Sequence, residues 1–212
     1  MGRGSDNQLV RRLLKTAGTT YADEAGIRLK DQPKPLFQLL ALAMLASKPI
    51  DATIAVQAAR ELFRAGLRTP QAVLESDRAT MISAFGRAHY VRYDESSVTR
   101  LVDIAAAVRD DYLGDLRKLA THDVKSTARL LKQFKGIGDT GADIFLREVQ
   151  DVWTWVRPYF DKRAVSAARQ LGLSTEADEL GALAPSDNAK LSAALVRVSL
   201  DDELRSKVRP QR

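Results

Sequence analysis

The sequence contains no cysteine and only two histidines, His89 and His122, among its 212 residues. The absence of cysteine excludes disulfide bonds, thiolate zinc sites and thiolate-bound iron–sulfur clusters, and the two histidines have no partner spacing that suggests a metal site. No apolar run approaches the ~20 residues that a membrane-spanning helix requires. The N-terminal segment MGRGSDNQLVRR also lacks the apolar core of a signal peptide. We therefore expect a soluble, cytoplasmic protein that has no membrane partner.

The charge balance is basic, with 33 lysines and arginines against 27 aspartates and glutamates, which gives a formal net charge of +6. A basic balance suits a polyanionic partner, although many basic proteins bind none. The hydrophobic content of 45% is sufficient for a buried core in one or two domains.

Helix signals recur along the chain, whereas no alternating run is long enough for a sheet. The sequence predicts an all-α fold with roughly ten helices, most of them short. Residues 18–35 are expected to be irregular, and Gly86 is expected to mark a turn. The expected helix starts are Ser5 (in a capping box with Gln8), Pro35, Asp51, Thr69, Asp77, Asp123, Thr140 and Ser186.

The stretch FKGIGDTGADIFLREV, residues 134–149, interrupts a helical pattern with glycines and then resumes it at once. Gly136 and Gly138 permit positive φ and a close approach of the backbone to a ligand. The helix that follows directs unpaired amides and its positive dipole end outward, which favours an anion such as a nucleic-acid phosphate. The alternative is an ordinary turn between two helices with a glycine cap.

Four segments resemble, in order, those of the helix–hairpin–helix DNA glycosylase superfamily, the endonuclease III and alkylpurine glycosylase group. They are LFQLLALAMLASKPID, FGRAHYVRYDESSVTRLVDIAAAV, the hairpin FKGIGDTGA at 134–142, and FDKRAVSAARQLGL, which contains Asp161. The similarity spans about residues 34–175.

The resemblance implies a two-domain helical DNA glycosylase fold in a monomeric protein. Residues 34–155 would form a barrel-like helical domain that contains the helix–hairpin–helix, at about 123–149. Residues 1–33 and 156–212 would form the second domain, with the active cleft between the two.

The resemblance also implies the site residues. Asp161 occupies the position of the catalytic carboxylate, which stabilises an oxocarbenium-like sugar or activates a nucleophile while the base is flipped out. The alternative for Asp161 is a purely structural N-cap, and the aromatic residues before it are more often core than pocket. The residues expected to contact double-stranded DNA are Lys48, Lys135, Gly136, Ile137, Gly138 and Thr140, and those expected to line a base pocket are Trp153, Trp155 and Tyr159.

The departures from the family pattern narrow the expected activity. Thr140 stands where bifunctional members carry the Schiff-base lysine, Lys48 replaces a wedge-loop glutamine, and Lys135 replaces a proline. We therefore expect a monofunctional glycosylase in base-excision repair that has no lyase activity, no iron–sulfur cluster and no organic cofactor. A sodium or potassium ion at the hairpin carbonyls near Phe134 and Ile137 is compatible with the resemblance. The alternatives are a non-catalytic DNA-binding module of the same fold and a helical interaction protein.

Overall fold

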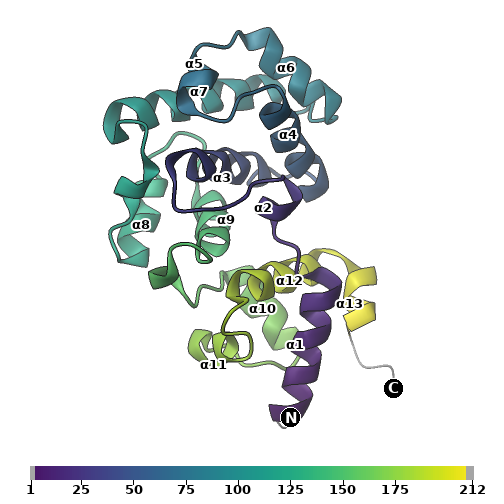
Figure 1. The fold of residues 1–212 in the computed structure, drawn as a ribbon. Helices are drawn as coiled ribbons and strands as arrows, with labels where there is room; N and C mark the ends of the chain where they lie inside the picture. Colours follow the sequence, from purple (N-terminus) through teal and green to yellow (C-terminus); the bar gives the residue numbers. More distant parts are fainter. Residues whose placement is uncertain (1–2, 209–212) are drawn as a thin grey trace. The chain divides into compact units, whose positions relative to one another are not determined.

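The computed structural model describes residues 3–208, and these residues form an all-helical protein without a β-strand (Figure 1). The prediction of an all-α fold is confirmed. Within the same residues, no helix is both long and apolar enough to cross a membrane. Residues 1–2 and 209–212, which the sequence analysis assigned to the second domain, lie outside the described part of the chain.

The chain divides into two compact units. The hairpin unit comprises Tyr21–Leu146, and the terminal unit combines the residues up to Thr20 with those from Arg147 onward. The predicted boundaries at residues 34 and 155 differ from these. Residues 21–33 belong to the hairpin unit, because α2 (Tyr21–Glu24) packs against α3 (Pro33–Ala46). The short helix α2 also corrects the expectation that residues 18–35 are irregular.

The hairpin unit is organised around α3, in which every residue from Leu36 to Leu45 is buried. Such a helix, apolar on all sides, requires neighbours around its whole circumference, and α3 contacts α2, α4, α7 and the 3-10 helix η1. The other helices of this unit are α4 (Ala52–Arg64), α5 (Pro70–Leu74), α6 (Arg78–Arg87), α7 (Asp94–Tyr112), η1 (Leu116–Leu119), α8 (Val124–Leu131) and most of α9 (Asp139–Val149).

The terminal unit is organised around α12 (Asn188–Leu200), which packs against α1 (Arg3–Ala17), α10 (Lys162–Gln170) and α13 (Asp202–Val208). Leucine and alanine side chains from these helices form its core, among them Leu13, Ala168, Leu191 and Leu195. The unit also contains the 3-10 helix η2 (Thr154–Val156) and α11 (Ala177–Ala182).

Side-chain caps confirm four of the predicted helix starts. In each case a side-chain oxygen accepts a hydrogen bond from an amide two or three residues further along the chain. The pairs are Asp51 with Thr53 N (2.7 Å), Thr69 with Ala72 N (3.2 Å), Asp77 with Thr80 N (2.6 Å) and Asp123 with Ser126 N (2.7 Å).

Three local predictions were wrong. Helix α1 begins at Arg3, so Ser5 lies inside the helix, where its hydroxyl contacts the Asp6 carboxylate at 3.3 Å rather than capping. The N-cap of α12 is Asp187 rather than Ser186, and its side chain makes no capping hydrogen bond. Gly86 lies within α6, and the chain turns after Arg87.

Candidate nucleic-acid interface

Helices α8 and α9 are joined by a turn at residues 132–138 (Figure 1). The amide of Phe134 donates to Leu131 O at 3.2 Å and continues the last turn of α8. The amide of Ile137 then donates to Phe134 O at 3.0 Å, which closes a tight turn around Lys135 and Gly136. Helix α9 begins at Asp139, close to the predicted start at Thr140. We call residues 134–142 the hairpin.

Gly136 is required by the fold. Its φ is +98°, a backbone conformation that residues with a side chain rarely adopt. A Cβ atom at this position would also lie 3.1 Å from Cγ of Arg100 on α7. Conformation and packing therefore both select glycine at position 136.

Gly138 is in a different situation. Its φ lies outside the left-handed region, and a Cβ atom added to it would have no described atom within 4 Å. The residue is exposed, and its carbonyl accepts the first hydrogen bond of α9, from Ala142 N at 3.0 Å. Gly138 therefore occupies the N-cap position without a side chain that can cap the helix. The first-turn amides of an α-helix have no acceptor within the helix itself.

The charges at the hairpin are mixed. Lys135 is exposed, and no carboxylate of the described residues pairs with it. Lys132 pairs with Asp139, the first residue of α9, through a 2.8 Å contact between Nζ and Oδ1. The Asp139 side chain is 87% exposed. An acidic residue in the first turn stabilises the helix dipole, and Lys132 offsets its negative charge at the site where an anion would bind.

The predicted DNA-contact residues differ in how exposed they are to solvent. Lys135, Gly138 and Thr140 are exposed, whereas Ile137 is buried with 4% exposure and anchors the turn from inside.

Lys48 follows the end of α3 and is partly buried. The structure brings its neighbour Ser47 close to the hairpin, because a Cβ atom at Gly141 would lie 3.6 Å from Cβ of Ser47.

The carbonyl oxygen of Phe134, one of the expected contacts of a sodium or potassium ion, already accepts one hydrogen bond within the turn. Phe134 O accepts the hydrogen bond from Ile137 N, and a carbonyl oxygen has a second lone pair that can contact a cation. The Phe134 ring is buried, with its centroid 5.5 Å from that of Tyr112. Within residues 3–208, no cluster of three or more histidine or acidic side chains is arranged to hold a metal ion.

Asp161 lies in the terminal unit and is the N-cap of α10. Its Oδ1 accepts a hydrogen bond from Ala164 N at 2.8 Å, and its Oδ2 accepts one from Nη1 of Arg147 at 2.6 Å. Both side chains of this ion pair are buried, with 6% exposure for Asp161 and 4% for Arg147. The fold thus engages both carboxylate oxygens and neutralises the charge.

The aromatic residues before Asp161 are held by local contacts. Trp153 is buried, with 3% exposure, and its ring stacks on that of Trp155 with a centroid distance of 5.6 Å. Tyr159 is partly buried, and its amide donates to Oε1 of Gln150 at 3.0 Å. Nε2 of Gln150 donates in return to Tyr159 O at 3.0 Å. Trp153 therefore belongs to the packing of this segment, and Trp155 and Tyr159 are the more accessible rings.

Sequence reasoning missed two sets of functional candidates. Arg147 sits within an apolar helical pattern, and nothing in its position signals the ion pair with Asp161. The second set, a group of basic side chains on and around α3 and α4, did leave a signal. Arg60 and Arg64 lie four residues apart on one face of α4, whereas Arg68 follows the end of this helix.

Comparison of the sequence with protein-family models and with curated proteins gave no match. Functional inference for this chain depends on its residues and their arrangement. The most informative arrangement is the open N-terminus of α9 at Gly138.

Proposed function

We propose that this protein binds double-stranded DNA and that the hairpin holds a backbone phosphate, as in the helix–hairpin–helix superfamily that the sequence resembles. The observation that carries the proposal is Gly138, an exposed glycine that neither its φ nor its neighbours require. A ligand that approaches the backbone closely gives a reason for glycine at this position.

The chemistry of the contact follows from the start of α9. The amides of its first turn and the positive end of its dipole suit a phosphate oxygen. The Thr140 hydroxyl and the Lys135 ammonium group, both exposed, add a hydrogen-bond donor and a positive charge at the same loop. Contacts of this kind fix the position of the duplex and do not read its sequence.

Duplex binding of the Gly138→Ala variant tests the proposal. Fluorescence anisotropy with a labelled duplex at low salt is expected to show affinity about tenfold weaker than wild type, because the methyl group separates the phosphate from the amides. Gly86→Ala is the matched control, since Gly86 is also exposed, has no positive φ and would place a Cβ in open space. Equal affinities for wild type and Gly138→Ala would refute the hairpin as the DNA contact.

Base excision is a second candidate function, favoured by the position of Asp161. Its carboxylate begins α10 and is buried a short distance along the chain from Trp155 and Tyr159. The carboxylate would act on an oxocarbenium-like sugar after exchanging its contact with Arg147 for one with the substrate. Thr140 in place of the hairpin lysine makes the expected reaction a hydrolysis without strand cleavage.

A panel of duplexes that each contain one damaged or mismatched base tests the second candidate. Alkali-sensitive abasic product from wild type, absent in Asp161→Asn while duplex binding persists, is the supporting result. If no lesion yields an abasic product and duplex binding is retained, the protein is a DNA-binding module without glycosylase activity.

A further inference from the structure

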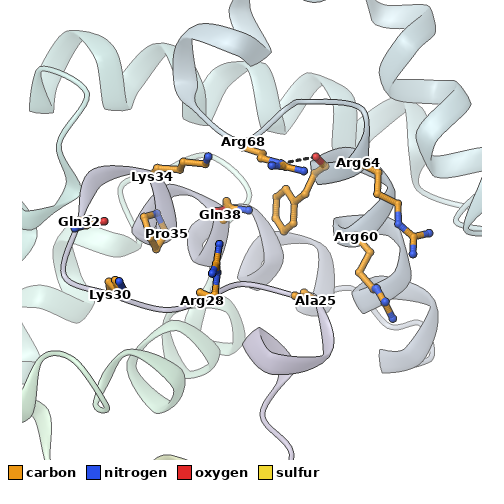
Figure 2. Close-up of a pocket in the computed structure, with 12 residues that line it drawn as sticks. Ala25, Arg28, Lys30, Gln32, Lys34, Pro35, Gln38, Arg60, Arg64 and Arg68 are labelled. Atoms are coloured by element: carbon orange, nitrogen blue, oxygen red, sulfur yellow. Dashed lines mark hydrogen bonds between the residues drawn. The ribbon is translucent and has the colours of Figure 1, made fainter.

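The hairpin unit contains a basic cavity of about 490 Å³, which is lined by six cationic residues (Figure 2). They come from the segment before α3, the first turn of α3, and α4 with the residues that follow it. The six residues are Arg28, Lys30, Lys34, Arg60, Arg64 and Arg68. The described lining residues include no aspartate or glutamate.

Most of this positive charge is not balanced within the protein. Arg64 pairs with Glu61 on α4 through a 2.6 Å contact. None of the other five cations has a carboxylate oxygen within 4.0 Å among residues 3–208. Arg68 donates from Nε to the backbone carbonyl of Phe63 at 2.6 Å, which fixes its guanidinium group at the cavity. Like charges held together repel one another, and an anionic ligand removes this cost.

A second, independent observation is the side chain of Gln38 on α3. Gln38 is 92% buried and lines the cavity, and its side chain forms no hydrogen bond with any other described residue, although its amide atoms are not fully shielded from solvent. In Figure 2 it lies among the basic side chains, between Arg28 and Arg68. The amide of Gln38 therefore has a donor and an acceptor that no described residue uses, and both are available to a ligand in the cavity.

Helix α3 also begins at the cavity. Its N-cap, Gln32, lines the cavity and makes no side-chain capping hydrogen bond. The positive end of the helix dipole therefore adds to the field of the cations. Pro33 and Pro35 have no amide hydrogen, so the side chains supply most of the hydrogen-bond donors.

We infer that this cavity binds a compact small molecule that carries two or more phosphate groups. Its volume lies within the range of about 300–1,000 Å³ that is typical of small-molecule sites, whereas a duplex presents a convex backbone. Arginine and lysine pair well with phosphate oxygens, and arginine does so in a bidentate manner. Phe63 and Pro35 add apolar surface beside the cations, which suits an organic group attached to the phosphates.

The basic cavity is separate from the hairpin. Helix α3 lines the cavity at its first turn, and the hairpin lies against Ser47, directly after its last residue. Fourteen residues of α-helix span about 21 Å. The two sites therefore occupy opposite ends of α3, and the cavity extends the proposal beyond DNA binding.

Isothermal titration calorimetry of the full chain tests this inference with three probes: inorganic pyrophosphate, inorganic tripolyphosphate and a nucleoside triphosphate. Wild type is expected to bind at least one of them with a dissociation constant on the order of micromolar. Stronger binding of the nucleoside triphosphate than of tripolyphosphate indicates an organic polyphosphate as the ligand, and equal binding indicates that the phosphates alone are recognised.

Two exposed arginines of the basic cavity provide the variants. Arg28→Gln and Arg60→Gln are each expected to weaken binding about tenfold, because each removes a charge-assisted contact. Arg169→Gln is the matched control, since Arg169 is an exposed, unpaired arginine on α10 in the terminal unit. Duplex affinity is measured in parallel, so that failure of this inference and failure of the DNA proposal are distinguished.

The Gln38→Met variant distinguishes a ligand-binding role of Gln38 from a purely structural one. The variant is expected to leave the Tm of the ligand-free protein unchanged within about 2 °C, because methionine has a similar volume and the amide has no partner among the described residues to lose. It is also expected to reduce the increase in Tm that pyrophosphate or tripolyphosphate produces. A lower Tm without ligand would contradict the reading of Gln38 as a ligand-binding group.

Two results would overturn the inference. One is the absence of binding to all three probes at millimolar concentration. The other is a loss of duplex affinity in Arg28→Gln and Arg60→Gln without polyphosphate binding by wild type, which would assign the cavity to the DNA contact surface.

Discussion

The hairpin loop at Gly138 and the carboxylate of Asp161 differ in how much of their bonding capacity the fold uses. Asp161 is buried, and both of its oxygens have protein partners, Ala164 N and the Arg147 guanidinium. Gly138 is exposed, and the amides that follow it have no acceptor within their helix. A group that the fold has already satisfied contributes to stability, whereas amides that lack an acceptor within their helix can bond to a ligand. This contrast supports the proposed binding role of the hairpin and favours a structural role for Asp161.

Replacing Asp161 with alanine is expected to have the largest effect. The change leaves the buried Arg147 without its closest counter-charge, and loss of one partner of a buried ion pair costs about 3–5 kcal/mol. Urea denaturation measures the free energy of unfolding. Asp51→Ala is the control, because Asp51 is also an N-cap but is exposed, and its loss is expected to cost about 1 kcal/mol. Similar losses in the two variants would contradict the structural role assigned to Asp161.

Gly136 and Gly138 allow a structural role and a binding role to be compared within one loop. Gly136→Ala is expected to lower the free energy of unfolding by more than about 1 kcal/mol, because its φ of +98° is strained for alanine. Gly138→Ala is expected to cost no more than about 1 kcal/mol, because alanine is a poorer N-cap than glycine, and to weaken DNA binding. Thermal or urea unfolding of both variants checks this. A loss of stability in Gly138→Ala as large as that in Gly136→Ala would show that the fold requires glycine at both positions.

The four confirmed helix caps were predictable because each joins a side chain to an amide only two or three residues away. The Arg147–Asp161 pair joins residues 14 positions apart, and the sequence pattern around Arg147 does not reveal which side of α9 is covered. The start of α9 followed from the glycines of the hairpin. The basic cavity combines α4 and the residues after it with the segment before α3, so the spacing of Arg60 and Arg64 indicated a basic helix face but not the cavity itself.

Glu61 offers a second buried carboxylate for comparison with Asp161. The guanidinium of Arg87 (2.8 Å) and then that of Arg64 (2.6 Å) lower the pKa of Glu61 below its usual value of about 4.5. Because the pKa is lower in the folded state, the stabilisation is fully present above pH 4.5 and is lost as the pH falls through the folded-state pKa. Urea denaturation between pH 6 and pH 3 is expected to show a smaller loss of stability for Glu61→Gln than for wild type. Identical pH dependence would contradict the role of these two arginines.

Charge changes at the hairpin are expected to have the smallest effects, and they are measured on duplex binding. Lys135→Gln is expected to weaken duplex binding a few-fold and to reduce the slope of log K against log salt by about one, because one phosphate contact is removed. Asp139→Asn is expected to strengthen binding a few-fold, since it removes a negative charge from the start of α9. Lys118→Gln, an exposed change on η1, is the control. Unchanged salt slopes in Lys135→Gln would place the phosphate contacts elsewhere.

Backbone amide chemical shifts, followed by NMR while a duplex is added, test the central claim most directly. We expect the largest chemical-shift changes at the amides of Gly138, Asp139 and Thr140, because these groups approach the phosphate. Duplex binding that leaves these three amides unchanged would contradict the assignment of the hairpin as the DNA-binding element.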